Sequence, residues 1–224
     1  HMALDGYKIQ NNIKHLLIDE MQDYSPIQYK VIQRIFPCRK TVLGDACQSV
    51  NPYGSSSADM IRKIFVNGTV MKLCKSYRST SEITDFAQNI LRNNEQETVS
   101  RHGEKPQILK MKNSEAEISA IADLIRDFKK SAYQSLGVIC KTQLLAKDIS
   151  DRLKLYTEDV HFLSNQSSTF IQGVVITSAH MAKGLEFDEV IVPQANDDNY
   201  SSEIDRSMLY VAVTRAMHKL VLTY

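Results

Sequence analysis

Two adjacent carboxylates follow a short apolar run near the beginning of the chain. The run HLLI at 15–18 has the composition of a buried strand, and Asp19 and Glu20 come directly after it. A carboxylate at the end of such a strand can hold Mg²⁺, and a second one can polarise a water molecule for attack on a phosphoryl group. An exposed turn with two acids would have the same sequence, so this feature alone leaves both interpretations open.

Four more polar clusters follow, each beside an apolar run. They are GDACQS at 44–49, KSYRST at 75–80, HMAKGLEFD at 180–188 and LYVAVTRA at 209–216. Taken in order after DEMQD at 19–23, these clusters resemble motifs II to VI of the UvrD/Rep/PcrA-like superfamily 1 helicases. The resemblance extends from about residue 15 to 224. It implies a RecA-like P-loop NTPase fold and an ATP-dependent helicase or translocase that moves on single-stranded DNA or RNA.

The resemblance gives the early residues roles in ATP hydrolysis. Asp19 would hold Mg²⁺, and Glu20 would be the base that orients the attacking water. Gln48 would sense the γ-phosphate, because a neutral amide can donate to a phosphate oxygen without taking a proton. The alternative for Gln48 is an ordinary surface glutamine.

The later clusters would complete the nucleotide site. By resemblance, the Tyr77 ring stacks on adenine, Arg78 and Arg215 reach the γ-phosphate from a second domain, and Glu186 contacts the ribose. Guanidinium suits this task, because it stays charged and offers a fork of donors to phosphoryl oxygens. Surface ion pairs are the alternative for the two arginines, and a solvent-facing residue at a helix start is the alternative for Glu186.

The same resemblance places four residues near a nucleic-acid strand. Thr177, His180 and Lys183 could hold phosphates without reading bases, and Tyr53 is a candidate stacking platform. The family usually has a longer apolar-aromatic stretch where this chain has VNPYG at 50–54. Tyr53 could therefore be a simple loop anchor, and His180 could be a buried structural histidine.

Composition excludes several other classes of protein. The 27 Lys and Arg residues nearly cancel the 26 Asp and Glu residues, so a net charge of +1 argues against a wholly basic nucleic-acid-binding coat. No apolar run approaches the roughly 20 residues of a membrane-spanning helix. The four cysteines have neither disulfide-rich nor zinc-ligand spacing. These features predict a cytoplasmic protein with reduced thiols and no membrane partner.

The elements that must position these residues alternate between strand-like and helix-like segments, which predicts an α/β fold with a mostly parallel, doubly wound sheet. Expected strands lie at 15–18, 41–43, 70–74, 107–111, 136–140, 160–163, 173–177, 190–192 and 219–223. Expected helices lie at 26–36, 59–65, 81–91, 115–130, 143–156 and 205–217, and 93–106 is expected to be a surface loop.

The distribution of these elements predicts two parts. Residues 1–69, with motifs II and III, would be the C-terminal remnant of a first RecA-like motor domain. Residues 70–224, with motifs IV to VI, would be the second one. His1-Met2 is typical of a cloning remnant, so we expect an excised piece that lacks an N-terminal part of its own chain. None of the eight glycines is followed by Lys, so the phosphate-cradling G-x-x-x-x-G-K-[ST] loop is absent, and the piece alone is expected to be inactive.

The spacing of the later motifs favours one branch of the family. About 100 residues separate Arg78 from Lys183, which leaves no room for the large extra domain of UvrD, Rep and PcrA. This compact spacing, and the sequence YSP at 24–26, resemble the HelD-like branch, whose motors remodel or release RNA polymerase complexes. An RNA polymerase partner is therefore the alternative to strand separation.

Overall fold

The computed structural model describes residues 8–50, 54, 57–91, 97–98, 100–164 and 172–224. The chain forms two compact units, residues 1–72 and 73–224. No helix in the described ranges is long and apolar enough to span a bilayer.

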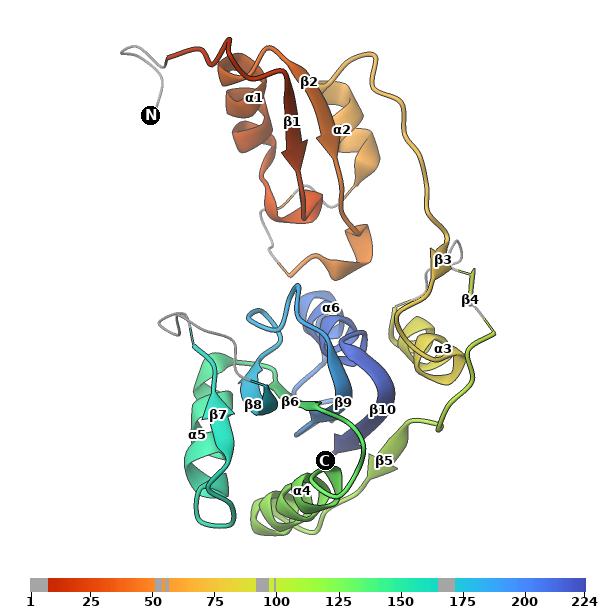
Figure 1. The fold of residues 1–224 in the computed structure, drawn as a ribbon, viewed down its shortest axis with the longest axis vertical. Helices are drawn as coiled ribbons and strands as arrows, with labels where there is room; N and C mark the ends of the chain where they lie inside the picture. The colour runs from red at the N-terminus through yellow and green to blue at the C-terminus, as the bar shows by residue number, and fades with distance from the viewer. Residues whose placement is uncertain (1–7, 51–53, 55–56, 92–96, 99, 165–171) are drawn as a thin grey trace. The chain divides into compact units, whose positions relative to one another are not determined.

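The first unit is built around two parallel strands, β1 (His15–Ile18) and β2 (Arg39–Val42), with helices α1 (Pro26–Ile35) and α2 (Ala58–Ile64) (Figure 1). Two single-turn 3-10 helices, η1 (Met21–Asp23) and η2 (Ala46–Gln48), follow the strands. Helix α1 begins at a capping box, in which Ser25 accepts from the Gln28 backbone N–H and the Gln28 side chain accepts from the Ser25 N–H. Ile18, Tyr29 and Ile61 form the buried centre of this unit.

The second unit contains a six-stranded, fully parallel sheet in the order β5-β10-β9-β6-β8-β7. Its strands are β5 (Gln107–Leu109), β6 (Ser135–Cys140), β7 (Val160–Phe162), β8 (Gly173–Ser178), β9 (Phe187–Val192) and β10 (Ala216–Thr223). Its helices are α3 (Ser81–Ile90), α4 (Ser114–Phe128), α5 (Gln143–Leu153) and α6 (Glu203–Val213). This arrangement confirms the predicted α/β class with a mostly parallel sheet.

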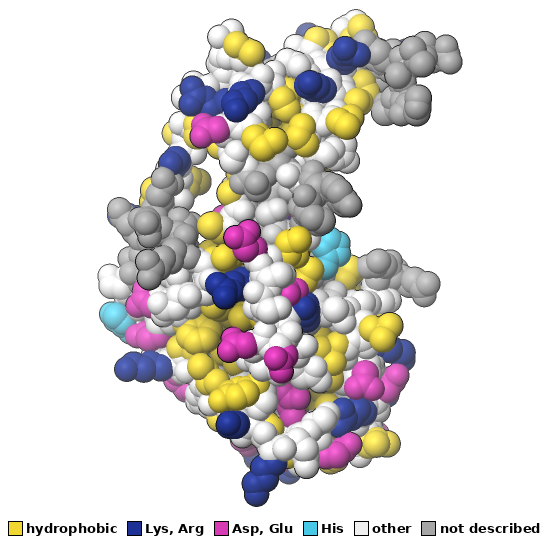
Figure 2. Space-filling model, turned by 180° about the vertical axis from the view of Figure 1, so that it is seen from behind, with side chains coloured by type: hydrophobic (Ala, Val, Ile, Leu, Met, Phe, Trp, Pro, Cys, Tyr) yellow, Lys and Arg dark blue, Asp and Glu magenta, His cyan; other side chains and the backbone are white. Residues whose placement is uncertain are grey.

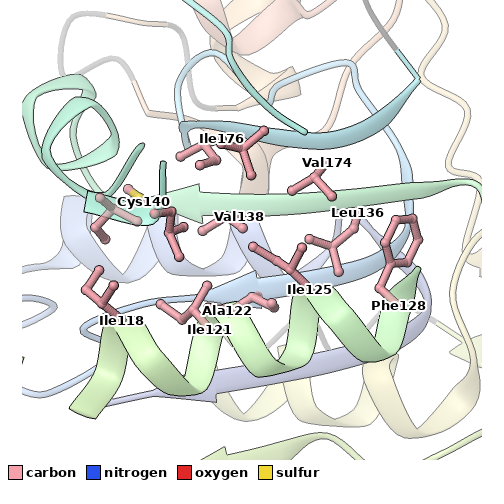
Figure 3. Packing of buried hydrophobic residues seen from close by; sticks show 14 of the residues in the cluster. Ile118, Ile121, Ala122, Ile125, Phe128, Leu136, Val138, Cys140, Val174 and Ile176 are labelled. Carbon is pink, nitrogen blue, oxygen red and sulfur yellow. The ribbon is translucent and has the colours of Figure 1, made fainter. Parts of the chain in front are cut away.

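Helices cover both faces of this sheet. Ile118, Ile121 and Ile125 of α4 point onto Leu136 and Val138 of β6 (Figure 3). Helix α5 packs beside α4 on the same core, whereas α3 and α6 contact each other and β10. Since alternate residues of a strand face opposite sides of a sheet, both faces of the central strands are largely buried, and most of their residues are accordingly apolar.

The pairing of β9 with β10 contains an irregularity near the beginning of both strands. Ala216 pairs with Phe187, and Lys219 pairs with Glu189, so three steps along β10 match two steps along β9. A bulge of this kind bends the strand and re-aims the side chains around it. It begins directly after Arg215 on one strand and Glu186 on the other.

The expected strand at 70–74 is wrong. Met71 and Leu73 are 84% and 92% exposed, and the segment has no strand assignment. The strand begins later, as the two-residue β3 (Lys75–Ser76), which pairs with β4 (Glu97–Thr98) inside the expected loop. Apolar composition alone cannot make a strand where no neighbouring strand supplies hydrogen bonds and no core covers the side chains.

Candidate functional site

The two acids lie at the carboxyl end of β1. Asp19 is exposed, and its Oδ1 accepts the Glu20 backbone N–H at 2.8 Å. Glu20 has φ 53° and ψ 53°, a left-handed conformation that non-glycine residues seldom adopt. The surrounding contacts must therefore hold this turn. It places two carboxylates at the strand end where ligands of parallel sheets bind.

Gln22 links this turn to the end of β2. Its side chain is fully buried; Nε2 donates to Glu20 Oε2 at 2.6 Å, and Oε1 accepts from the Asp45 N–H at 3.2 Å. Asp45 in turn holds Gln48, whose Nε2 donates to Asp45 Oδ2 at 3.0 Å. A continuous path of hydrogen bonds therefore connects the carboxylate of Glu20 with the amide of Gln48.

This path requires a glycine at position 44. A Cβ there would lie 2.5 Å from the Met21 backbone nitrogen and 2.5 Å from Gln22 Oε1, closer than side chains and backbone tolerate. We expect Gly44→Ala to destabilise the first unit by about 1–3 kcal/mol, the usual cost of overpacking. Hydrogen exchange of the β1 and β2 amides measures this loss. Gly68→Ala is the comparison in the same unit, and we expect a smaller loss, because its Cβ would meet only the Phe65 carbonyl, in a tight contact at 3.3 Å.

In the second unit, the two candidate arginines converge on one turn. Arg78 Nε lies 2.6 Å from Glu186 Oε1, in an ion pair that is partly exposed on both sides. Arg215 is 1% exposed, and it donates from Nη1 to the Leu185 carbonyl at 3.3 Å and from Nε to the Val211 carbonyl at 3.2 Å. Residues 185 and 186 therefore bind both guanidinium groups, just before β9.

The segments beside the two arginines are also held by hydrogen bonds. Ser79 Oγ donates to the Ala216 carbonyl at 2.6 Å, and the Phe187 N–H donates to the Arg215 carbonyl at 3.0 Å. The predicted ion pair of Arg78 thus exists, and its partner is Glu186, itself a candidate for nucleotide contact. Glu186 precedes a strand and not a helix, but it is exposed, as its alternative interpretation as a solvent-facing residue expected.

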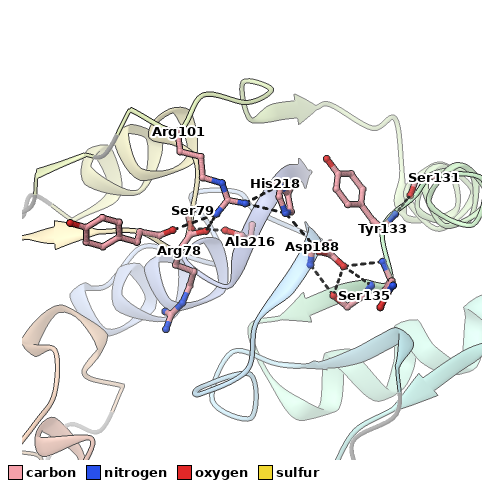
Figure 4. A network of polar contacts seen from close by, with 11 residues as sticks. Arg78, Ser79, Arg101, Ser131, Tyr133, Ser135, Asp188, Ala216 and His218 are labelled. Carbon is pink, nitrogen blue, oxygen red and sulfur yellow. Dashed lines mark hydrogen bonds and ion pairs between the residues drawn. The ribbon is translucent and has the colours of Figure 1, made fainter.

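The Tyr77 ring is 69% exposed and is accessible for stacking. Its carbonyl, and that of Arg78, accept hydrogen bonds from Arg101 Nη1 at 3.4 and 2.7 Å. Figure 4 shows this guanidinium between the 77–79 segment and His218.

Asp188 anchors the far end of this polar network. Its Oδ2 accepts the Gln134 N–H, the Ser135 N–H and the Ser135 hydroxyl, each at 2.9 Å. Burial alone would raise the pKa of Asp188, but these hydrogen bonds outweigh that effect and lower the pKa below its ordinary value. Asp188 therefore stays ionised beside His218, whose Nε2 lies 3.9 Å from Asp188 Oδ1.

The candidates for nucleic-acid contact divide into three groups. His180 is exposed and Lys183 is partly exposed, on the loop between β8 and β9, so the interpretation of His180 as a buried histidine is wrong. Thr177 is fully buried and donates to the Leu163 carbonyl at 3.2 Å. Contrary to expectation, it cannot touch a ligand in this conformation. Tyr53 lies outside the described residues.

Charge is mixed on the surface of the second unit. On the face shown in Figure 2, Lys and Arg side chains are interspersed with Asp and Glu side chains rather than gathered into one basic stripe. Any contact with nucleic acid there would depend on individual residues more than on a broad electrostatic field.

Comparison with known proteins identifies the family. The UvrD/REP helicase N-terminal domain matches residues 6–67, and the UvrD-like helicase C-terminal domain matches residues 71–170 and 173–223. The solved C-terminal domain of a possible DNA helicase from Lactobacillus plantarum WCFS1 is 34% identical with a TM-score of 0.56, over 66% of this chain and 86% of that one. The chain belongs to the UvrD-like helicase family.

Curated relatives of this UvrD-like chain are longer. The ATP-dependent DNA helicase PcrA of Leuconostoc citreum is 27% identical over 162 residues, which are 65% of this chain and 21% of PcrA. A putative ATP-dependent DNA helicase, R568, of Acanthamoeba polyphaga mimivirus is 26% identical over 242 residues, 95% of this chain and 34% of R568. The chain thus spans about a fifth to a third of these relatives, and its parallel sheet with flanking helices is the RecA-like fold of the family.

Two residues of the UvrD-like chain that organise the candidate site had no role assigned from sequence. Gln22 stands inside the DEMQD motif, and its position two residues after Glu20 was the available signal. Arg101 stands outside the motifs, in a polar segment between β4 and β5, where nothing in the sequence distinguishes it from a solvated arginine.

Proposed function

We propose that the chain is part of an ATP-dependent DNA helicase or translocase that couples ATP hydrolysis to movement on single-stranded DNA. The observation that carries this proposal is the convergence of Arg78 and Arg215, 137 positions apart in sequence, on the 185–186 turn. Arg78 is partly exposed and can reach a ligand directly, whereas Arg215 is buried in this conformation and would have to move to reach one. Two guanidinium groups beside one acidic residue suit a site that binds a phosphoryl group and a ribose.

The first unit would supply the metal and water chemistry. Among the described residues, no group of three or more His, Cys, Asp or Glu side chains could hold a metal by itself. Mg²⁺ needs no such cage, because it commonly binds one or two carboxylates together with substrate phosphates. The exposed Asp19 fits that mode, and bound Mg²⁺ would neutralise charge on the phosphate oxygens.

Glu20 would orient the attacking water. Gln22 donates to one of its oxygens, which fixes the orientation of the carboxyl group. Gln48 would bind the γ-phosphate, and the hydrogen bonds through Asp45 and Gln22 would couple its position to that of the Glu20 carboxylate. In the second unit, His180 and Lys183 would contact backbone phosphates of the DNA strand, a mode of binding that is independent of base sequence.

Glu20→Gln tests the proposal in the full-length protein. We expect the variant to lose on the order of 10²-fold in DNA-stimulated ATP turnover, since a positioned general base contributes about that much. Its binding of ATP should remain, because glutamine keeps the size of the side chain. Steady-state phosphate release with and without a single-stranded oligonucleotide measures turnover, and a tailed duplex reports unwinding.

Glu158→Gln is the matched control, because Glu158 is exposed on the turn between α5 and β7. The 224-residue chain alone should show no steady hydrolysis, because it contains no phosphate-cradling Gly-Lys sequence. Wild-type protein that hydrolyses no ATP in the presence of DNA would overturn the proposal.

The compact second unit favours a second candidate function. The described residues between α3 and β8 are occupied by β4, β5, α4, β6, α5 and β7, all elements of the basic fold. A motor of this kind could act on RNA polymerase complexes in place of a duplex. Co-purification with RNA polymerase, and ATP-dependent release of the polymerase from a DNA template without unwinding of a tailed duplex, would favour this candidate.

A further inference from the structure

Arg101 binds the backbone of the segment that contains Arg78. Its Nη1 donates to the Arg78 carbonyl at 2.7 Å and to the Tyr77 carbonyl at 3.4 Å. Its own carbonyl accepts the Ser81 N–H at 2.8 Å. Side chain and backbone of one residue therefore hold both ends of the 77–81 turn, just before the first turn of α3.

The other side of the Arg101 guanidinium rests on β10. Its Nη2 lies 3.1 Å from each ring nitrogen of His218. The His218 ring stacks on Tyr133, with centroids 5.0 Å apart and planes inclined by 24°. In Figure 4, Arg101 approaches His218 from one side and Tyr133 lies on the other. These contacts limit the movement of a long side chain that would otherwise sample many rotamers.

These contacts form a closed chain of neighbours that begins and ends at Arg78. Its guanidinium binds Glu186, Asp188 follows two residues later and faces His218, and His218 contacts Arg101, which returns to the Arg78 carbonyl. Arg78 is therefore held separately at its side chain and at its backbone. If the Arg78 guanidinium leaves Glu186 and binds a phosphoryl group, the hydrogen bond from Arg101 to the Arg78 carbonyl remains.

We propose that Arg101 is a positioning residue for Arg78. By fixing the Tyr77 and Arg78 carbonyls, it sets the point from which the Arg78 guanidinium and the Tyr77 ring reach a nucleotide. The proposal rests on the proposed ATPase function for the role of Arg78, but the clamp itself involves residues of the second unit alone. It assigns a function in hydrolysis to a residue outside the motifs.

The first test measures the clamp without nucleotide. Arg101→Gln removes the charge and the second arm of the guanidinium, and Arg152→Gln is the matched control. Arg152 also bridges segments of the second unit, from α5 to Ser114 and Glu115, away from the turn. In the 224-residue chain, we expect amides of 77–84 to exchange roughly 10-fold faster in Arg101→Gln, the effect of losing charge-assisted hydrogen bonds. Arg152→Gln should leave them unchanged.

The second test measures ATP turnover in the full-length protein. Arg101→Gln should lower kcat by roughly 10- to 100-fold, because a small misplacement of a catalytic group has that effect. The KM for ATP should change much less than kcat. Because loss of folded protein would also lower apparent kcat at constant KM, kcat is expressed per ATP-binding site, counted by titration with ATP. In an Arg78→Ala background, Arg101→Gln should lower kcat much less than in wild type, because the guanidinium that it positions is gone and only the Tyr77 ring remains to be placed.

The outcomes separate this proposal from the proposed function. Wild-type protein without ATPase activity contradicts the proposed function, and the proposal for Arg101 fails with it. Active wild-type protein with a normal kcat in Arg101→Gln contradicts only the role of Arg101. Unchanged exchange at 77–84, or additive effects of the two substitutions, also overturns that role.

Discussion

Arg78→Ala is expected to lower the ATP turnover of the full-length protein by roughly 10³-fold or more, the range found for arginine fingers. The guanidinium lies at the same turn as Arg215, and it would balance charge that spreads over the phosphoryl oxygens during transfer. Alanine removes that charge entirely. Steady-state kcat at saturating ATP and DNA is the measurement.

Stability should change little in this variant. The Arg78–Glu186 pair is partly exposed on both sides, and such pairs contribute at most about 1 kcal/mol. Arg126→Ala, at an exposed position of α4, is the control for loss of a surface arginine. A rate close to wild type in folded Arg78→Ala protein would remove Arg78 from the catalytic site.

Ile125→Ala should destabilise the second unit by about 2–5 kcal/mol, through the lost burial of its side chain and the cavity left behind. Ile125 is fully buried, between α4 and the sheet (Figure 3). Because the chain has two units, one unfolding curve need not report either unit alone. Hydrogen exchange of the slowest amides of β6 and β8 measures the second unit directly.

Leu144→Ala is the control for this substitution. Leu144 is 85% exposed near the beginning of α5, so truncation should leave the exchange of β6 and β8 within about 0.5 kcal/mol of wild type. Equal losses in the two variants would contradict the assignment of α4 to the core.

The central strands were predictable because burial on both faces makes their sequences continuously apolar. The VIC stretch of β6 and the VIV stretch of β9 are of this kind. The same rule failed at 70–74, where an apolar run remains uncovered. Thr177 lies in a strand, as expected, and the error concerns only the nucleic-acid contact that the resemblance implied, because the buried hydroxyl donates to a neighbouring carbonyl instead. Hydropathy reports the tendency of a side chain to be buried and not the neighbours that are available.

The residues of the candidate site that belong to one motif could be predicted from the sequence. The residues whose role depends on distant partners could not. The acids after β1 were predicted at a strand end, and the structure places them there. The roles of Gln22 and Arg101 depend on partners supplied by folding. Asp45 is 23 positions from Gln22, and His218 is 117 positions from Arg101. Spacing within one segment contains no information about such distant neighbours.

The irregular step between Ala216 and Lys219 has a consequence for how this region can vary. It leaves the Ala216 carbonyl facing Ser79 while His218, two positions later, meets Arg101. Removing one residue there would restore an even ladder, in which Lys219 still pairs with Glu189, and would remove the local bend that aims the His218 side chain at Arg101. Substitutions in this stretch would alter single contacts, whereas a deletion would uncouple the two arginine-bearing segments from each other. Its length is therefore constrained more tightly than its composition.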